Sequence, residues 1–429
     1  MQKFRSHSLP YGRRSVSIEL EADRLEHRGG PPIANEEAAV LDAIRNPIGT
    51  PPLYEIVKPG ERIAIIVNDI TRLTRTDLML PPIVGTLNDA GIPDADIFIV
   101  FALGIHRRQT ADERRSIIGD ALFHRIRNFD HVCDDEANLV TVGTTRFGNT
   151  VEVNRKVMEA DRIILTGEIM YHLIAGYSGG RKGLVPGVAG WRTTTFNHRM
   201  IFEPQCGSGI LDGNPSHEDL LDACRLVEPD FLVNVVLTPD GKLARVVAGH
   251  YDVAHREGCK TVDELLSVPI DDPYDLLIVS AGGYPLDIDL RQAHKGLENA
   301  CRALSPGGTI LFHAECSNGS GHPSFDQYVT RYADDIEMKR ALLDHFEIGG
   351  HKAYWVARLG RLFNIHLVSE LPSAFVECCH LHPVPFERHA GRLLELVREA
   401  GTSARIGVIP HSGHTLPRLE VCPEVAASY

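Results

Sequence analysis

The segment RIAIIVNDITR, residues 62–72, decides the fold class of this chain. Residues 62–67 form a short apolar run, which is typical of a strand buried on both faces of a parallel sheet. Polar residues follow at once, from Asn68 to Arg72, so the carboxyl end of this strand carries groups that can bind a ligand. Ligands of α/β proteins bind at such strand ends. The segment therefore predicts an α/β domain with a site beyond this strand.

Two further apolar runs end in the same way. Residues 97–101 lead to His106, after which Thr110–Glu113 provides a capping box for a helix. Residues 162–165 lead to His172. Three β units that each end in a reactive side chain predict a mainly parallel sheet. An imidazole with an ordinary pKa of ~6.5 can act as a general base near neutral pH, so both histidines are candidate bases.

The third run opens into a glycine-rich stretch, GEIMYHLIAGYSGGRKGLVPGVAGWRTTTFNHRM, at residues 167–200. Glycine permits positive φ and close approach to a ligand, and we interpret the whole stretch as a loop shaped around one. It is not a P-loop, because Gly183 rather than Ser or Thr follows Lys182, and no G-x-G-x-x-G follows the first strand. Backbone N–H groups and Arg181 could still hold a phosphate. The residues alone predict an anion-binding α/β enzyme of undefined chemistry.

Two further side chains admit alternative interpretations. His198 could be a metal ligand, since imidazole suits nickel, copper, zinc and iron, although a lone histidine is more often structural. Arg72 offers a planar fork that suits a carboxylate, with a structural ion pair as the alternative. Cys378-Cys379-His380-Leu381-His382 matches no zinc spacing, and we interpret it as the buried end of a strand.

The composition excludes several classes of protein. The chain has 429 residues, 43% hydrophobic and 24% charged, which is enough to build more than one globular domain. Its formal net charge of -13 argues against a nucleic-acid or anionic-membrane surface. Nine cysteines without a C-x-x-C pair favour reduced thiols. The polar N-terminus and the absence of a run of 18 apolar residues predict a cytoplasmic protein that neither crosses nor binds a membrane.

The order of the patterns predicts two α/β domains with mainly parallel sheets and an active site in the cleft between them. Two apolar runs around Thr238–Lys242 predict an antiparallel hairpin at a sheet edge. A new β-α-β pattern begins after SVPIDDP, and its helix places Gln292 and Lys295 on one face. The predicted division is residues 1–272 for a cofactor-binding domain, 273–412 for a C-terminal domain, and 413–429 for a tail that packs back on the first domain.

Four separated motifs resemble those of the nickel-dependent lactate racemase family, and they occur in the order found in that family. They span most of the chain, from the first strand into the second domain. The motifs are Asp69-x-Thr71-Arg72, Gly104-Ile105-His106-Arg107, Tyr171-His172 through Ser178-Gly179-Gly180-Arg181-Lys182 to Asn197-His198-Arg199, and Gly282-Gly283-Tyr284-Pro285-Leu286-Asp287 to Gln292-x-x-Lys295.

The resemblance implies a particular cofactor. Members of that family use a nickel pincer nucleotide, a pyridinium mononucleotide whose thioamide and thiocarboxylate groups hold nickel through sulfur, carbon and sulfur. Lys182 corresponds to the lysine that bears this cofactor through its thioamide, and His198 to the protein ligand of the nickel. The resemblance also implies partners that make the cofactor. The other implied cofactor contacts are Asp69, Thr71, Ser178, Gly179 and Gly180.

The resemblance also implies a reaction, the racemisation or epimerisation of a 2-hydroxy acid at C2 by hydride transfer through a 2-keto acid. His106 and His172 would be the two bases that take the hydroxyl proton of opposite stereoisomers. Arg72 would clamp the substrate carboxylate, and Gln292 with Lys295 would hold carboxylate or keto oxygen.

One position departs from the family pattern, because Arg291 stands where lactate enzymes carry a tyrosine before the glutamine. A guanidinium can recognise a second carboxylate or a polyol, which predicts a substrate larger or more polar than lactate, such as a malate-like or sugar acid. An ion pair of Arg291 with Asp287 or Asp289 is the alternative. Two other functions stay open: a nicotinamide-dependent 2-hydroxyacid dehydrogenase, and a non-catalytic carrier of a nickel nucleotide.

Overall fold

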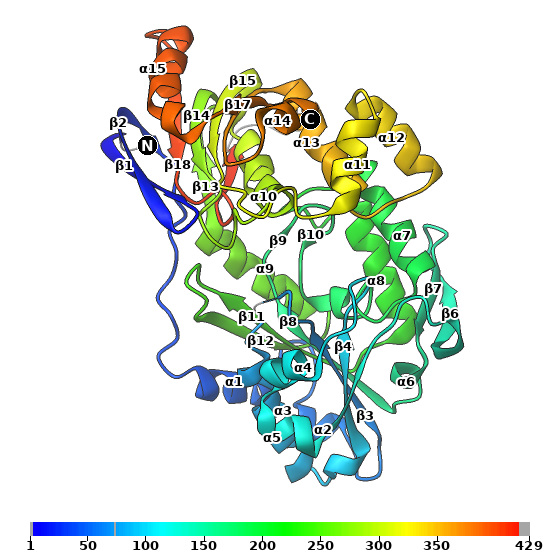
Figure 1. Cartoon of the computed structure of the whole chain (residues 1–429). Helices are drawn as coiled ribbons and strands as arrows, with labels where there is room; N and C mark the ends of the chain where they lie inside the picture. The colour runs from blue at the N-terminus through cyan, green and yellow to red at the C-terminus, as the bar shows by residue number, and fades with distance from the viewer. Residues whose placement is uncertain (1–2, 73, 420–429) are drawn as a thin grey trace. The chain divides into compact units, whose positions relative to one another are not determined.

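The computed structural model describes residues 3–72 and 74–419, which form two compact units (Figure 1). The first unit comprises residues 29–265, and the second comprises residues up to Arg28 together with those from Leu266 onward. This division differs from the predicted one, because the N-terminal hairpin belongs to the second unit. Strand β2 (Arg14–Arg24) pairs in parallel with β18 (Ile406–Ile409), and this pairing joins the hairpin to the second sheet.

The first unit is built on a mainly parallel sheet with strand order β12-β11-β8-β3-β4-β5. Only the pair at one edge, β11 and β12, is antiparallel, which confirms the predicted hairpin. The main strands are β3 (Ile63–Asn68), β4 (Ile97–Ala102), β5 (Arg127–Asp130), β8 (Arg162–Glu168), β11 (Phe231–Leu237) and β12 (Leu243–Gly249), and the short hairpins are β6 (Leu139–Thr144) with β7 (Thr150–Asn154) and β9 (Tyr171–His172) with β10 (Gly176–Tyr177).

Helices cover both faces of this sheet, because successive side chains of a strand point to opposite faces. Ile63, Ile65 and Val67 join a core with α1, α3 and α4, whereas Ala64 and Ile66 join a second core with α8. The helices are α1 (Glu36–Arg45), α2 (Leu53–Ile56), α3 (Thr76–Asp89), α4 (Ala111–Ile118), α5 (Asp120–Arg125), α6 (Arg155–Met158), α7 (Trp191–Arg199), α8 (Pro215–Val227) and α9 (Val253–Leu266), with 3-10 turns η1 (Asp94–Asp96), η2 (Glu136–Asn138), η3 (Gly180–Gly183) and η4 (Met200–Phe202).

The second unit has its own sheet, with strand order β1-β2-β18-β14-β15-β16-β17, parallel from β2 to β17. The strands are β1 (Lys3–Tyr11), β13 (Ser267–Ile270), β14 (Tyr274–Ser280), β15 (Leu304–His313), β16 (Asn364–Val368), β17 (His382–Val384) and β19 (Leu416–Leu419), besides β2 and β18. The helices are α10 (Leu290–Cys301), α11 (Pro323–Arg331), α12 (Asp335–Asp344), α13 (Gly350–Leu362), α14 (Ser373–Cys378) and α15 (His389–Ala400), with η5 (Phe386–Arg388).

The fold confirms the predicted α/β class with mainly parallel sheets. Of the predicted C-terminal tail, Leu416–Leu419 pairs in parallel with β13 of the second unit, and residues 420–429 lie outside the described part of the chain. Over residues 3–72 and 74–419, none of the helices is long and apolar enough to cross a membrane.

Candidate active site

The strand order of the first sheet reverses between β3 and β8. From β3 the chain moves outward to β4 and β5, and it then returns to the other side of β3 to form β8 and β11. Ligands of open α/β sheets bind where the strand order reverses in this way, beyond the carboxyl ends of the strands. The residues that follow these carboxyl ends include the predicted Asp69, Thr71 and Arg72 after β3, His106 after β4, and His172 after β8.

A hydrogen-bonded pair, Asp69 and His106, stands at this edge of the sheet. The distance from His106 Nδ1 to Asp69 Oδ2 is 2.5 Å, and the Asp69 side chain is only 4% exposed, against 43% for His106. Thr71 donates to the other carboxylate oxygen from both its hydroxyl, at 2.7 Å, and its backbone N–H, at 3.2 Å. A carboxylate only accepts, so the imidazole proton sits on Nδ1 and Nε2 carries the lone pair. This geometry would allow His106 to accept a proton at Nε2.

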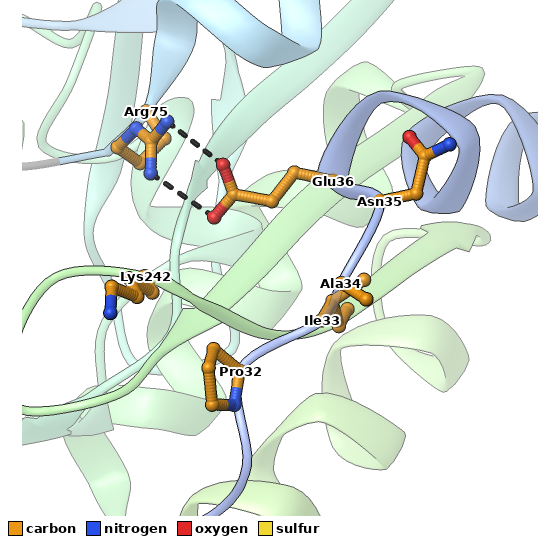
Figure 2. Close-up of a pocket in the computed structure, with 7 residues that line it drawn as sticks. All are labelled: Pro32, Ile33, Ala34, Asn35, Glu36, Arg75 and Lys242. Carbon is orange, nitrogen blue, oxygen red and sulfur yellow. Dashed lines mark hydrogen bonds and ion pairs between the residues drawn. The ribbon is translucent and has the colours of Figure 1, made fainter.

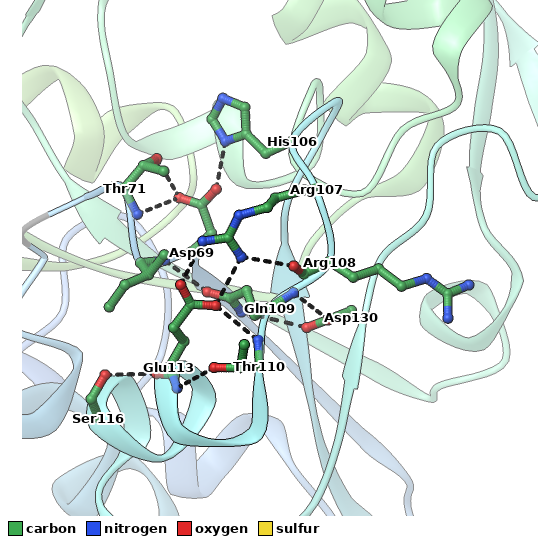
Figure 3. A network of polar contacts seen from close by, with 11 residues as sticks. Asp69, Thr71, His106, Arg107, Arg108, Gln109, Thr110, Glu113, Ser116 and Asp130 are labelled. Carbon is green, nitrogen blue, oxygen red and sulfur yellow. Dashed lines mark hydrogen bonds and ion pairs between the residues drawn. The ribbon is translucent and has the colours of Figure 1, made fainter. Parts of the chain in front are cut away.

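Neighbouring groups anchor both loops that carry this pair (Figure 3). Gln109 accepts a hydrogen bond from the Ile70 backbone and donates its own backbone N–H to Asp130 at 2.9 Å. The predicted capping box at α4 is present, with Thr110 and Glu113 each bonded to the other's backbone. The loop that contains His106 is thus fixed to the start of α4 and to the end of β5.

The environment of Asp69 keeps it ionised. Burial raises its pKa, but the hydrogen bond and charge of His106, followed by Thr71 and Arg72, outweigh burial and leave the pKa below its ordinary value. We expected Asp69 and Thr71 to contact a cofactor. The described side-chain hydrogen bonds of Asp69 and Thr71 join them to each other and join Asp69 to His106. This geometry supports a role in orienting His106. Contact with a cofactor stays a prediction.

The glycine-rich stretch is less irregular than we predicted. It contains the β9–β10 hairpin and the 3-10 turn η3, and its last part, residues 191–199, is the helix α7 rather than loop. The Thr193-Thr194-Thr195 run has low helix propensity, and for this reason the sequence did not predict a helix here. Tertiary contacts override that propensity, because buried Asn197 donates to the Asp219 carboxylate of α8 at 2.9 Å.

The turn at Ser178–Gly180 is held from inside the protein. The Ser178 hydroxyl donates to the Glu168 carbonyl at 2.8 Å, and the Gly180 backbone N–H donates to Asn234 Oδ1 at 2.7 Å. Gly179 has φ 70, and a Cβ there would lie 2.7 Å from the same Asn234 oxygen. The Gly180 amide is therefore used by the protein rather than offered to a phosphate. Sequence reasoning missed Asn234, although a lone amide inside the apolar strand FLVNVVL was a signal.

Arg181, which the sequence left as a possible phosphate contact, is buried in the protein instead. Its side chain is 1% exposed, and its guanidinium donates to the Ala175 carbonyl at 2.6 Å. It also lies 2.9 Å from His255 Nε2, which in turn lies 2.8 Å from the Ser178 carbonyl oxygen. Burial lowers the pKa of Arg181 to about 10, so it remains a cation at neutral pH. The buried Arg181 side chain therefore stabilises the glycine-rich turn from inside the protein.

Lys182 and His172 are in contact. Lys182 Nζ lies 2.9 Å from His172 Nε2, and both side chains are partly exposed. On the other side of the ring, the backbone N–H groups of Ile174 and Ala175 both point at His172 Nδ1, at 3.2 Å each. The structure thus brings the predicted attachment lysine and one predicted base together.

His198 lies on α7, where its Nδ1 is 2.9 Å from the Thr194 carbonyl oxygen. A carbonyl only accepts, so Nδ1 bears the proton and Nε2 carries the lone pair. Histidines that bind metals donate their other ring N–H to a carbonyl or carboxylate in just this manner. Within residues 3–72 and 74–419, no three His, Cys, Asp or Glu side chains gather to hold a metal. A bound cofactor is one possible source of further donors to a metal at His198.

Glu168, at the carboxyl end of β8, is an acid that we did not predict as a site residue. Burial raises its pKa to about 8, against the opposing charge of Arg72. Glu168 therefore keeps its proton to a higher pH than an ordinary glutamate. An acid directly after the apolar run RIILTG was the available signal.

The second unit gathers the remaining predicted side chains at the start of α10. Lys295 Nζ donates to Gln292 Oε1 at 2.7 Å, which confirms their shared helix face. Lys352 Nζ, from α13, lies 3.2 Å from the buried His294 Nε2. Sequence reasoning missed Lys352, because no local pattern links α13 to α10. In a chain of formal net charge -13, this end of α10 carries a concentration of cations.

Arg291 belongs to the same group and has unused hydrogen-bonding capacity. Its Nε is buried with no hydrogen-bond partner among the described residues. The acids proposed as its partners have other roles: Asp287 accepts backbone N–H groups of Gly12 and Glu315, and Asp289 caps α10 through the Gln292 N–H. Burial raises the pKa of Asp289 although Arg291 lowers it. The guanidinium is therefore a candidate for binding a ligand.

A separate pocket lies next to the start of α1, and two of its charged side chains, Arg75 and Glu36, pair with each other (Figure 2). Arg75 pairs with Glu36 at 3.1 Å, and Glu36 also accepts the Leu243 backbone N–H at 2.9 Å. We therefore do not assign the site to this pocket. Its lining comprises Pro32, Ile33, Ala34, Asn35, Glu36, Arg75 and Lys242.

Comparison with known proteins agrees with this geometry. The lactate racemase N-terminal domain matches residues 11–209, and the lactate racemase C-terminal domain matches residues 271–412. The chain belongs to the lactate racemase family. It is 30% identical over 415 residues to the lactate racemase of Thermoanaerobacterium thermosaccharolyticum, covering 94% of this chain and 96% of that protein. It is 34% identical over 366 residues to that of Lactiplantibacillus plantarum, covering 83% and 86% respectively.

A solved structure gives the same result. The lactate racemase apoprotein from Thermoanaerobacterium thermosaccharolyticum superposes with a TM-score of 0.88 at 28% sequence identity, covering 96% of this chain and all of that one. Family membership and fold together make this chain a racemase, an enzyme of the isomerase class.

Proposed function

We propose that this racemase inverts C2 of a 2-hydroxy acid more polar than lactate, with a nickel pincer nucleotide held at Lys182 and His198. The Asp69–His106 pair is the observation that carries the proposal, because it presents an oriented base at the crevice where α/β proteins bind ligands. Membership of the lactate racemase family supports a racemisation reaction. The proposal also requires partner enzymes that make the cofactor, and it keeps the predicted cytoplasmic location.

The donor groups of the first unit fit this cofactor. His198 supplies a single imidazole in the tautomer that suits metal binding, and a pincer nucleotide would bring the other donors of the nickel itself. Lys182 supplies an amine near the glycine-rich turn. When bound, the nickel pincer nucleotide supplies the acceptor for the C2 hydride.

The side chains of this chain handle the proton and the carboxylate. His106 Nε2 takes the hydroxyl proton of one stereoisomer, and Asp69 stabilises the imidazolium that results. His172 takes the corresponding proton of the other stereoisomer, since each stereoisomer needs its own acceptor. Arg72 binds the substrate carboxylate through its planar fork, and Gln292 with Lys295 binds carboxylate or keto oxygen.

The decisive test of the reaction is retention of a deuterium label. The enzyme, co-expressed with the cofactor-making enzymes, should racemise a C2-deuterated 2-hydroxy acid in light water and keep most of the label, because the hydrogen returns from the cofactor to the same carbon. Mass spectrometry of the product measures this. Rapid loss of label would contradict hydride transfer. Net formation of keto acid that depends on added NAD would indicate a dehydrogenase instead.

Arg291 supports the more polar substrate. Its Nε lacks a partner among the described residues, and the neighbouring Asp287 and Asp289 accept backbone N–H groups. A second carboxylate on the substrate would satisfy the guanidinium, whereas the methyl group of lactate would leave its donors unpaired. We therefore place malate-like dicarboxylates first, and sugar acids second.

Replacing Arg291 by Tyr should shift the preference toward lactate. A hydrogen bond to a charged group contributes about 1.5–3 kcal/mol, so kcat/KM for malate relative to lactate should fall by roughly 10–100-fold. Steady-state racemisation of both acids measures the ratio. The exposed Arg340→Tyr on α12 is the control and should leave the ratio unchanged. An unchanged ratio in Arg291→Tyr would show that this arginine does not select the substrate.

A further inference from the structure

The contact between Lys182 and His172 constrains where protons can sit. Backbone N–H groups only donate, and those of Ile174 and Ala175 both point at His172 Nδ1. Nδ1 therefore carries the lone pair, and the single proton of a neutral imidazole sits on Nε2. This tautomer follows from two independent donors on one short turn. It makes Nε2 a donor toward Lys182.

A hydrogen-bond donor at Nε2 suits only one form of Lys182. The Nζ atom is 2.9 Å from Nε2, and an ammonium group has no lone pair to accept with. A neutral amine does have one. For Lys182 to be charged, the imidazole would have to move its proton to Nδ1, against both backbone donors. The preceding residue, Arg181, adds a buried positive charge, which also disfavours a second cation.

We propose that His172 holds Lys182 as a neutral amine and so makes it the nucleophile that takes up the cofactor. This inference rests on the proposed function and extends it from racemisation to the earlier step of covalent loading. His172 then acts twice, first on the lysine and later on the substrate. His172, on β9, is a titratable group in contact with Lys182 Nζ, and the cation Arg181 precedes Lys182 on η3.

The loading step balances without an oxidant or reductant. The Lys182 nitrogen attacks the carbon of a thiocarboxylic acid on the incoming nucleotide and forms a C–N bond. The C–O bond of the S=C–OH tautomer breaks, and its hydroxyl leaves with one amine proton as water. The product is a thioamide that retains one N–H. A neutral amine is required because an ammonium nitrogen has no electron pair with which to attack.

The test measures the reactivity of Lys182 without any cofactor. The purified protein is acetylated with a trace of acetic anhydride at several pH values, and peptide mass spectrometry compares Lys182 with Lys260, which is 67% exposed on α9. Lys182 should titrate at least one pH unit below Lys260, which corresponds to about tenfold more neutral amine at pH 7. Coincident titration of the two lysines would overturn the proposal.

Variants show whether the reactivity of Lys182 comes from His172 or only from the exposure of Lys182 to solvent. His172→Gln should raise the labelling midpoint of Lys182 toward that of Lys260, whereas His124→Gln, at a side chain 64% exposed on α5, should leave it low. If His172→Gln does not fold, the pH profile of the unchanged protein still decides. A low midpoint in His172→Gln would assign the effect to other groups and overturn the role of His172.

A second readout distinguishes this inference from the proposed function. Intact mass after co-expression with the cofactor-making enzymes should show an added mass on the unchanged protein, none on Lys182→Ala, and at least tenfold less on His172→Gln after a short induction. Equal loading of His172→Gln would overturn the inference and leave the cofactor assignment standing. No added mass on any protein, with a low Lys182 midpoint, would overturn the loading role and count against the proposed cofactor, while the neutral amine would stand.

Discussion

Replacing Asp69 by Asn should lower kcat for racemisation by about 10²–10⁴-fold, the range observed when an oriented base loses its partner or its protonation state. Asp69 Oδ2 lies 2.5 Å from His106 Nδ1 and fixes the proton there. An asparagine has the same shape, but its NH₂ group would donate toward Nδ1 and move the ring proton to Nε2. His106 would then present a donor where the reaction needs an acceptor. The amide oxygen could still accept from Thr71.

Steady-state kinetics on purified, loaded enzyme measures this effect, and it should appear in kcat more than in KM. Thr71→Val is the matched control, because it removes a hydroxyl donor to Asp69 and leaves the carboxylate and its contact with His106 in place. We expect this control to lose less than tenfold. An Asp69→Asn enzyme within threefold of the unchanged enzyme would show that His106 needs no orientation by a carboxylate.

The pH dependence of this pair has a definite sign. The pKa of Asp69 is lower in the folded protein than its ordinary value, so the unfolded chain binds more protons at this site. The contribution of Asp69 to stability is therefore present above the ordinary pKa of aspartate and is lost as the pH falls through the lowered value. Protonation of the carboxylate should also remove the acceptor that orients His106, so stability measured by unfolding should decline at this acid pH.

Much of the first sheet could be predicted, because each buried parallel strand is a short apolar run that ends in polar residues. The strands at β3, β4 and β8 and the capping box at Thr110 all follow such local patterns. Helix α7 could not be predicted, because its threonine-rich sequence has low helix propensity. The helix is stabilised by the hydrogen bond from Asn197 to Asp219, a residue of α8 that is distant in the sequence. We also placed the end of a strand at Cys378, and this was wrong, because residues 373–378 form the helix α14.

Only part of the candidate site could be predicted from the sequence. Side chains that follow a strand, such as His106, could be found from position alone. The burial of Arg181 could not, because arginine is rarely buried and its partner His255 is distant in the sequence. The N-terminal hairpin was assigned to the wrong unit for a similar reason, since pairing of β2 with β18 joins residues almost a whole chain apart.

The two histidines proposed as bases differ in their proton arrangement, and the sequence holds no sign of this. His106 carries its proton on Nδ1 because a carboxylate accepts it, whereas His172 carries its proton on Nε2 because backbone amides occupy Nδ1. His106 is therefore ready to accept a proton at Nε2. His172 can do so only after its tautomer changes. That change requires the backbone amides of Ile174 and Ala175 to move away from Nδ1.

Replacing His198 by Ala should remove nickel from the protein and reduce racemisation to the background rate. Loss of a group that merely orients a ligand weakens metal binding by about 10–100-fold, and loss of the ligand itself should cost more. His198 Nδ1 donates to the Thr194 carbonyl, which would leave Nε2 as the atom that binds a nickel ion. The part of the chain that the structure describes contains no cluster of three donor side chains that could replace it.

Metal analysis of the intact enzyme together with its intact mass makes this test specific. His198→Ala should keep the added mass of the organic cofactor on Lys182 while its nickel falls to less than about one tenth of the unchanged level. Lys182→Ala should lose the added mass. His124→Ala, at a side chain 64% exposed on α5, should change neither. Retention of nickel by His198→Ala would show that nickel binding does not depend on His198 and would overturn its role as the metal ligand.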